Sequence, residues 1–237
     1  MCVVAIGLEA HPLWQLVVAG NRDEFHTRTS APLARWADGS GVIAGRDLVS
    51  GGSWMGISEA GRLAVVTNIR NADGPDPTKL SRGALVTDWL AHGALPADPS
   101  AYNPFNLAVT SNGTGLYLAN RPEPTRTVLG TGTHGFSNAI PNEHWPRKDR
   151  LIHELGYWQD GKSGCAHALL DLLGDERIPE PGAQPIFIRN PVYGTRCSTV
   201  ILVDVAGKGR IFERRYNAEG VTIGETTLDF AWATKPC

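Results

Sequence analysis

Two stretches near the amino terminus decide the fold: CVVAIGL (residues 2–8) and LWQLVVAGNRDEF (residues 13–25). The first stretch is apolar on both alternating faces, which predicts a central strand that is covered on two sides. Turn residues at 9–12 follow it, and the run 13–19 predicts a second strand, so the two would form a hairpin. The polar cluster at 20–25 would then be the tip of the second strand, at the same end of the sheet as Cys2.

The rest of the chain shows runs of strands and runs of helices that do not alternate one by one. Short strands are expected at Gly41–Ala44, Ser53–Ser58, Leu63–Asn68, Phe105–Thr110, Gly115–Asn120, Cys197–Val205, Arg210–Tyr216 and Thr226–Ala231. Helices are expected at Arg82–His92, between an N-cap at Ser81 and Gly93, at Trp145–Leu155, ended by Gly156, and at Cys165–Leu173, ended by Gly174. This order predicts an α+β protein in which two mainly antiparallel sheets stack and carry helices on their outer faces. No linker divides the chain, so we expect a single domain over residues 1–237.

Composition excludes several classes of protein. The 237 residues include 22 Lys and Arg against 24 Asp and Glu, without a basic block, which argues against nucleic acid as a partner. The hydrophobic fraction of 42% excludes intrinsic disorder. No apolar run reaches the roughly 20 residues of a membrane helix, so no transmembrane segment is expected.

The four cysteines, Cys2, Cys165, Cys197 and Cys237, have neither the spacing of a zinc site nor that of a disulfide framework. The apolar start lacks the basic region of a signal peptide, and Glu9 and His11 follow it too soon for one. We therefore expect no metal, no required cofactor and a cytoplasmic, reducing location.

Cys2 is the first candidate for chemistry. If methionine aminopeptidase removes Met1, which a small second residue permits, one residue carries both a thiol and a free α-amine. The amine has an ordinary pKa of about 7.7–8 and can accept the proton of the thiol, so a single residue supplies nucleophile and base. The alternative is an inert small apolar residue buried in a strand.

The second candidate is the tetrapeptide Asn21-Arg22-Asp23-Glu24. Polar and charged residues that close an apolar strand are costly unless they are solvated or paired. The cluster is therefore either an exposed hairpin tip or a preorganised polar site. Its expected position beside Cys2 favours the site.

Further candidates lie in glycine-punctuated segments: Asn68, Asn138 and Arg196. An Asn amide can donate a hydrogen bond to a developing oxyanion, and an Arg can hold an anionic group or order the nucleophile. The alternative for an Asn beside Gly is ordinary turn chemistry. The proline-rich stretch 178–193, just before Arg196, is expected to be a long surface loop that acts as a lid or rim.

Taken together, these motifs resemble one protein family in order along the chain. They are Met1-Cys2, the NRDEF run at 21–25, GGSWMGI at 51–57, LAVVTN at 63–68, SRG at 81–83, YNPFNL at 102–107, GFSNA at 135–139 and YGTR at 193–196. The combination is similar to the Transport and Golgi organisation protein 2 family, also called the NRDE family after its tetrapeptide.

The resemblance implies the four-layer αββα sandwich of N-terminal nucleophile hydrolases, whose cysteine branch includes penicillin V acylases and bile salt hydrolases. It implies Cys2 as nucleophile, Arg22 and Asp23 as flanking residues, and a late arginine at Arg196. Asn68 and Asn138 correspond to the amides on the oxyanion side. Because neighbours in a regular strand point to opposite faces, only one of Arg22 and Asp23 can face Cys2 unless the strand breaks at Gly20.

The resemblance also implies that the chain handles a small hydrophobic ligand, in haem trafficking or in lipid and acyl-coenzyme A homeostasis. Haem is then a possible ligand, although no Cys-Pro dipeptide is present and Met1 and Met55 are the only methionines. The alternative is an N-terminal-cysteine amidohydrolase or thioesterase that works by acyl transfer through Cys2. A structural or interaction role at the Golgi is the third hypothesis, and sequence alone leaves open whether the chain is an enzyme.

Overall fold

The chain forms two compact units, each built around one antiparallel sheet. A computed structural model describes residues 2–71, 74–111, 113–140, 143–161 and 165–233. Both units are assembled from segments that are not contiguous in the sequence, which agrees with the lack of a dividing linker. That the chain is a single domain stays a prediction.

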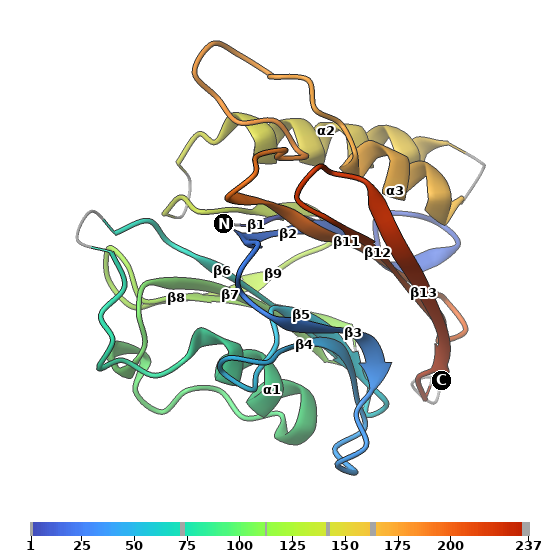
Figure 1. Ribbon diagram of the computed structural model, residues 1–237. Coiled ribbons are helices and arrows are strands. Elements are labelled where there is room, and N and C mark those ends of the chain that lie inside the picture. Colours follow the sequence, from blue (N-terminus) through green and yellow to red (C-terminus); the bar gives the residue numbers. More distant parts are fainter. Residues whose placement is uncertain (1, 72–73, 112, 141–142, 162–164, 234–237) are drawn as a thin grey trace. The chain divides into compact units, whose positions relative to one another are not determined.

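The first unit contains a sheet with the strand order β10-β1-β2-β11-β12-β13, and every pairing in it is antiparallel (Figure 1). Its strands are β1 (Cys2–Leu8), β2 (Trp14–Phe25), β10 (Gly132–Phe136), β11 (Tyr193–Asp204), β12 (Lys208–Tyr216) and β13 (Thr222–Ala231). β1 and β2 are consecutive in the chain and pair directly, as the sequence predicts for a hairpin.

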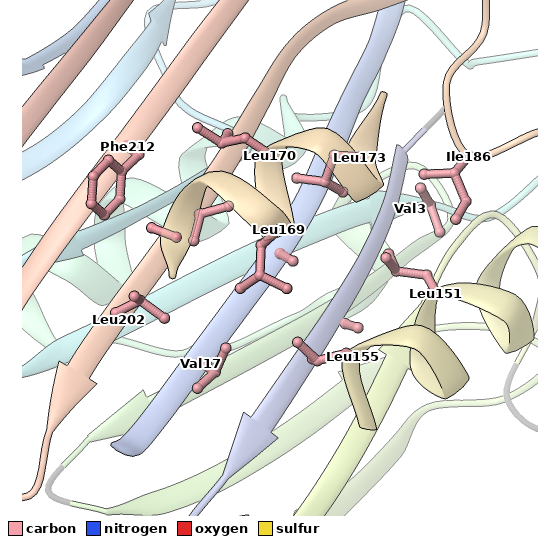
Figure 2. Close-up of a cluster of buried hydrophobic side chains, with 14 residues drawn as sticks. Val3, Val17, Leu151, Leu155, Leu169, Leu170, Leu173, Ile186, Leu202 and Phe212 are labelled. Carbon is pink, nitrogen blue, oxygen red and sulfur yellow. The ribbon is translucent and has the colours of Figure 1, made fainter. Parts of the chain in front are cut away.

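Two helices, α2 (Pro146–Asp160) and α3 (Ala166–Leu173), cover one face of this sheet. Odd-numbered residues of β1 and β2, such as Val3 and Val17, point toward them (Figure 2). Leu155 of α2 and Leu169 of α3 are fully buried in this cluster. Burial of side chains of this size contributes about 1.5–3 kcal/mol each and fixes the helices against the sheet.

The second unit contains the sheet β3-β4-β5-β6-β7-β8-β9, also antiparallel throughout. Its strands are β3 (Ser30–Arg35), β4 (Val42–Asp47), β5 (Met55–Ser58), β6 (Arg62–Asn68), β7 (Phe105–Ser111), β8 (Thr114–Ala119) and β9 (Thr125–Leu129). A short 3-10 helix, η1, spans Pro99–Ala101. The helix α1 (Arg82–His92) packs its buried Leu85, Val86 and Leu90 on one face of the sheet.

Sequence signals locate α1 to the residue. The Ser81 side chain accepts a hydrogen bond from the backbone N–H of Gly83, and Gly93 ends the helix in the left-handed region at φ 68°. Glycine adopts this conformation without the steric penalty of a Cβ atom. The predicted bounds of this helix are confirmed.

Other element predictions need correction. β2 does not end before the polar tetrapeptide but continues to Phe25, because β11 pairs with it along this length. α2 does not end at Gly156 but continues to Asp160, since the residues after Gly156 still contribute the buried Gln159. Three strands were not predicted: β3, β9 and β10, which are short and contain mainly polar, small or partly exposed residues.

The predicted surface loop at 178–193 is irregular up to β11, but part of it is core. Ile186 is fully buried and Phe187 nearly so. The backbone oxygen of Ile186 accepts hydrogen bonds from Asn21 of the sheet and Arg147 of α2, which hold this part of the loop against both elements. A lid role for this loop stays a prediction.

The α+β class with two antiparallel sheets, each carrying helices, is confirmed.

Candidate active site

The end of β2 places adjacent residues of the tetrapeptide on opposite faces of the first unit's sheet. Arg22 lies directly opposite Cys2 of β1 and, on its other side, opposite Cys197 of β11. Residues that face each other across antiparallel strands share a face. Asn21 and Asp23 therefore point to the other face, which α2 and α3 cover. The strand is unbroken at Gly20, so Arg22 is the member of the Arg22–Asp23 pair that shares a face with Cys2.

Cys2 is partly buried at the first position of β1, and its backbone oxygen accepts a hydrogen bond from Ser137 Oγ at 2.9 Å. Burial raises the pKa of the Cys2 thiol, and the negative charge of Asp23 acts in the same direction. The backbone N–H of Asp23 and the positive charge of Arg22 lower the pKa of the same thiol. Burial therefore favours the protonated thiol, while the positive charge of Arg22 and the backbone of Asp23 favour the thiolate.

Asp23 forms a fully buried ion pair with an arginine of α2. Its Oδ2 accepts from Arg147 Nη2 at 2.7 Å, and its Oδ1 accepts from Thr195 Oγ1 at 2.7 Å. The backbone oxygen of Asp23 accepts from the Tyr193 hydroxyl at 2.8 Å. The Asp23 side chain is therefore fixed to α2 and β11.

Asn21 connects the same face of β2 to the last carbonyl of α3 and to a carbonyl of the loop that follows. Its Nδ2 donates to the backbone oxygens of Leu173 at 2.8 Å and Ile186 at 3.0 Å. Its Oδ1 accepts from Ser198 Oγ at 2.6 Å. Since Asn21 is 2% exposed, these bonds satisfy a buried amide and hold the segment around Ile186 against the sheet.

Arg196 is the extra residue of a β-bulge, because Asp23 pairs with Thr195 and Arg22 with Cys197. Its Nη1 donates to the backbone oxygens of Phe25 at 3.0 Å and His26 at 3.1 Å, which ties β11 to the end of β2. Burial lowers the pKa of Arg196, with the positive charge of Arg22 as a further cause. The two guanidinium groups therefore interact at the end of the sheet that also carries Cys2.

The two predicted amides belong to the second unit, where they contact each other. Asn138 Nδ2 donates to the backbone oxygen of Asn68 at 2.6 Å. Asn138 is 1% exposed, and within the described part of the chain its Oδ1 has no hydrogen-bond partner. One amide hydrogen of Asn138 is thus occupied by the protein itself. Their predicted role beside an oxyanion stays a prediction.

Arg147 was not among the residues predicted from the sequence. The residue is on the buried side of α2 at the same spacing as the core residues Leu151, Leu155 and Gln159, four positions apart along the helix. An arginine at a core position of an amphipathic helix predicts a buried acidic partner, because an unpaired buried charge is costly. That spacing is the signal that could have identified Arg147.

Two other thiols differ from Cys2 in their surroundings. Cys165 is exposed just before α3. Cys197 is buried, and burial followed by the charge of Glu213 raises its pKa well above the ordinary thiol value. One strand separates Cys2 from Cys197, a spacing of about 9–10 Å between Cα atoms, which is too long for a disulfide.

Within the described ranges, no three or more His, Cys, Asp and Glu side chains are grouped so that they could hold a metal ion. A search of the same ranges for a helix that is long and apolar enough to cross a membrane found none. That the chain requires no cofactor stays a prediction.

The chain is similar to known proteins in sequence and in fold. The sequence model of the family described as Transport and Golgi organisation 2 matches residues 1–218. The human Transport and Golgi organization protein 2 homolog is 30% identical over 97% of this chain and 99% of its own length. The mouse homolog is 31% identical over 90% of this chain and 92% of its own.

Among solved structures, the Caenorhabditis elegans ortholog of N-acylethanolamine-hydrolyzing acid amidase is similar with a TM-score of 0.54. The match covers 84% of this chain and 92% of that chain, at 12% sequence identity. Similarity at this identity shows a shared fold alone, and it confirms the N-terminal nucleophile hydrolase-like fold that the sequence motifs imply.

Proposed function

Because the chain belongs to the Transport and Golgi organisation 2 family, we propose that it handles a hydrophobic acyl ligand at Cys2, and that its chemistry is acyl transfer to the Cys2 thiol. The substrate class is an amide or a thioester of a fatty acyl group, acyl-coenzyme A included. The proposal places this activity in the cytoplasm, where reducing conditions keep the thiol free.

One observation carries the proposal: Cys2 begins a buried strand directly opposite Arg22, and both the positive charge of Arg22 and hydrogen bonding to the backbone of Asp23 act to lower the pKa of its thiol. A structural cysteine needs apolar neighbours, whereas this thiol has a guanidinium and a polar backbone group beside it. Both groups stabilise negative charge on sulfur, which a nucleophile must carry when it attacks a carbonyl carbon.

The proposed reaction requires that Met1 be removed, so that the α-amine of Cys2 is free. The amine accepts the proton of the thiol, and the sulfur forms a bond to the acyl carbon. Collapse of the tetrahedral intermediate breaks the C–N or C–S bond, and the leaving group takes the proton from the amine. Water then gives one proton to the amine and attacks the acyl-thioester carbon. The C–S bond to Cys2 breaks, the fatty acid is released, and the amine returns the proton to the thiolate.

Arg22 has a second use in this scheme. A guanidinium group binds phosphate and carboxylate with two parallel hydrogen bonds. Arg22, together with Arg196, therefore suits a ligand that combines an apolar chain with an anionic head.

The same pairing of a thiol with guanidinium groups favours a second candidate, the binding of haem. A cysteine thiolate can be an axial ligand of haem iron, and the arginines could pair with its propionate groups. In this case Cys2 would hold the cargo without turnover. Loss of the Cys2 thiol would abolish acyl turnover under the first candidate and change haem binding under the second.

The test is hydrolysis of an acyl-coenzyme A and of an N-acyl amide by the wild-type chain and by the C2A and C2S variants. We expect turnover by the wild type and its loss to background in both variants. The matched control is C165A, which removes an exposed thiol and leaves turnover unchanged. Unchanged turnover in C2A would overturn the acyl-transfer proposal.

Titration of the same proteins with haem addresses the second candidate. A Soret shift with the wild type that changes in C2A but not in C165A would support ligation by Cys2. No Soret shift with the wild type would contradict haem binding.

A further inference from the structure

A row of paired residues crosses the first unit's sheet on the face that carries Cys2. It takes one residue from each of β1, β2, β11, β12 and β13, which lie side by side in that order (Figure 1). Each member lies opposite the next in an antiparallel pairing, so all of them share one face: Cys2, Arg22, Cys197, Arg215 and Gly224. Neighbouring strands are about 4.8 Å apart, which places Arg215 about 14 Å from Cys2 across the sheet. We call these residues the Cys2 row.

Side-chain contacts agree with the face assigned to Arg215. Its Nη1 donates to Glu213 Oε1 at 3.2 Å and to Thr226 Oγ1 at 2.8 Å. Glu213 and Thr226 lie opposite each other on β12 and β13, one same-face pair further along the two strands. The preceding residue, Arg214, points to the other face, because its Nη1 donates to Asp171 of α3 at 3.3 Å. The two adjacent arginines of β12 thus lie on opposite faces of the sheet.

Positive charge is concentrated in the Cys2 row. At the paired positions of β1, β2, β11 and β12 on this face, arginine occurs at Arg22 and Arg215 alone, and both belong to this row. The row two pairs further along is apolar and almost fully buried: Ile6, Val18, Ile201 and Ile211. Packing of this face therefore does not call for a charged residue, and the arginines mark the end of the sheet at which Cys2 lies.

The guanidinium group of Arg215 is held through one of its three nitrogens. Both of its hydrogen bonds within the described part of the chain use Nη1. The N–H groups of Nε and Nη2 form the parallel pair with which a guanidinium binds a phosphate or a carboxylate, and no described residue accepts from them. The side chain of Arg215 is 26% exposed, whereas that of Glu213 is 3% exposed. A buried carboxylate thus orients a guanidinium group that itself reaches the surface.

Gly224 provides the space for this guanidinium group. A Cβ atom at this position would lie 2.4 Å from Nη2 of Arg215, which is closer than such atoms approach each other. Any other residue would therefore displace the guanidinium group from its present position. Glycine inside a strand weakens the strand and often marks a close approach of another group. The pairing of Gly224 with Arg215 favours a role for the guanidinium group at this position.

We propose that Arg215 is an anion subsite for the leaving group of the ligand at Cys2: it binds a phosphate or carboxylate of that group, about 14 Å across the sheet from Cys2. The inference rests on the proposed function and narrows its substrate class. A thioester whose thiol carrier is anionic, such as coenzyme A, can engage Arg215. An N-acyl amide of an uncharged amine cannot, so the subsite favours the thioester.

The experiment measures binding without turnover. The full-length protein is titrated in a calorimeter with desulfo-coenzyme A, which has the phosphates but no thiol, and with S-methylglutathione, which has carboxylates. We expect at least one of these two probes to bind the wild type, and its Kd to rise about tenfold in R215M because a charge-assisted double hydrogen bond is lost. S-methylpantetheine has no anionic group and should not distinguish R215M from the wild type. The probe that responds identifies the anion as phosphate or carboxylate.

The matched control is R214M, the neighbouring arginine on the other face of β12. It breaks the ion pairs of Arg214 with Asp171 and Glu225 and should leave the Kd of the charged probe unchanged. G224A keeps the charge of Arg215 but displaces its guanidinium group, so it should raise the same Kd. If R215M does not fold because Glu213 loses this contact, R215K and G224A decide, and a rise of about threefold or more in both supports the proposal.

A Kd of the charged probe that stays close to the wild-type value in R215M, or in both R215K and G224A, would overturn the proposal. An equal rise in R214M would do the same, as would a wild type that binds neither charged probe or binds inorganic phosphate as tightly as desulfo-coenzyme A. The readout needs no turnover. The expected rises without acyl turnover would therefore refute the proposed function but not the subsite, and turnover that depends on Cys2 without these rises would do the reverse.

Discussion

The two faces of β2 use alternate residues of one tetrapeptide for different purposes. On the face covered by α2 and α3, Asn21 and Asp23 are buried and bound to fixed partners: the last carbonyl of α3, a loop carbonyl, a serine, an arginine and a threonine. On the other face, Arg22 lies opposite a thiol of perturbed pKa. A polar motif in a strand can therefore serve a different purpose on each face of the sheet. Substitutions on the first face should act mainly on stability, and those on the second on the reactivity of Cys2.

The largest effect is expected at Asp23. Replacing it with alanine leaves Arg147 buried without its counter-charge and should lower the free energy of unfolding by about 3–5 kcal/mol, as measured by urea denaturation. The neighbouring E24A, on the other face, serves as control and should change the free energy by no more than about 0.5 kcal/mol. Equal losses in the two variants would contradict the division between the faces.

A smaller loss is expected at Asn21. N21A removes hydrogen bonds to the backbone oxygens of Leu173 and Ile186, which stay buried, and should lower the free energy of unfolding by about 2–3 kcal/mol. S198A removes only one partner of this amide and should lower it by about 1 kcal/mol. If Asn21 belonged to the reactive face, N21A would instead alter the alkylation of Cys2 while the unfolding midpoint stayed in place.

Arg22 should show the opposite behaviour. R22M removes a positive charge that favours the thiolate, so the pKa of Cys2 should rise and alkylation at neutral pH should slow by about three- to tenfold. R22K keeps the charge and should stay close to the wild type. Faster alkylation in R22M would show that Arg22 acts as a cover over the thiol rather than as a charge beside it.

The smallest effect concerns the buried thiol of Cys197. Its folded-state pKa is raised by burial, so its contribution to stability is fully present below the pKa of the unfolded chain, about 8.5, and is lost as pH rises toward the folded value. The free energy of unfolding should therefore fall at alkaline pH by at most about 1.4 kcal/mol per pH unit for this group. C197A should flatten that fall, whereas C165A, at an exposed position, should not. If the free energy of unfolding of C197A fell with pH at the same slope as that of the wild type, the fall would come from other groups.

The sequence predicted those parts of the fold in which local chemistry decides. Ser81 and Gly93 located α1 because capping is a local interaction. Gly156 does not end α2, although glycine often follows the last residue of a helix. It is partly exposed, and an added Cβ would meet no neighbour within 4 Å. The helix continues to Asp160 and buries Gln159. β9 and β10 lack the apolar alternation of a half-buried strand and depend on pairing with β8 and β1, which no local pattern reveals.

Part of the geometry around Cys2 was predictable for the same reason. The period of two along a strand was enough to predict that Arg22 and Asp23 could not both face Cys2 in an unbroken strand. What sequence could not show is which of them does, since this depends on the register between β1 and β2. Arg147 is 124 residues from Asp23 in the chain, so only the tertiary fold brings the two together.

Mass spectrometry of the purified protein shows whether Cys2 is the residue that is acylated, when it is applied both to the intact chain and after brief exposure to an acyl thioester that is quenched with acid. We expect a chain that begins at Cys2 and carries the added acyl mass on its amino-terminal peptide. A chain that retains Met1, or one in which the acyl mass appears on Cys165 and not on Cys2, would contradict it.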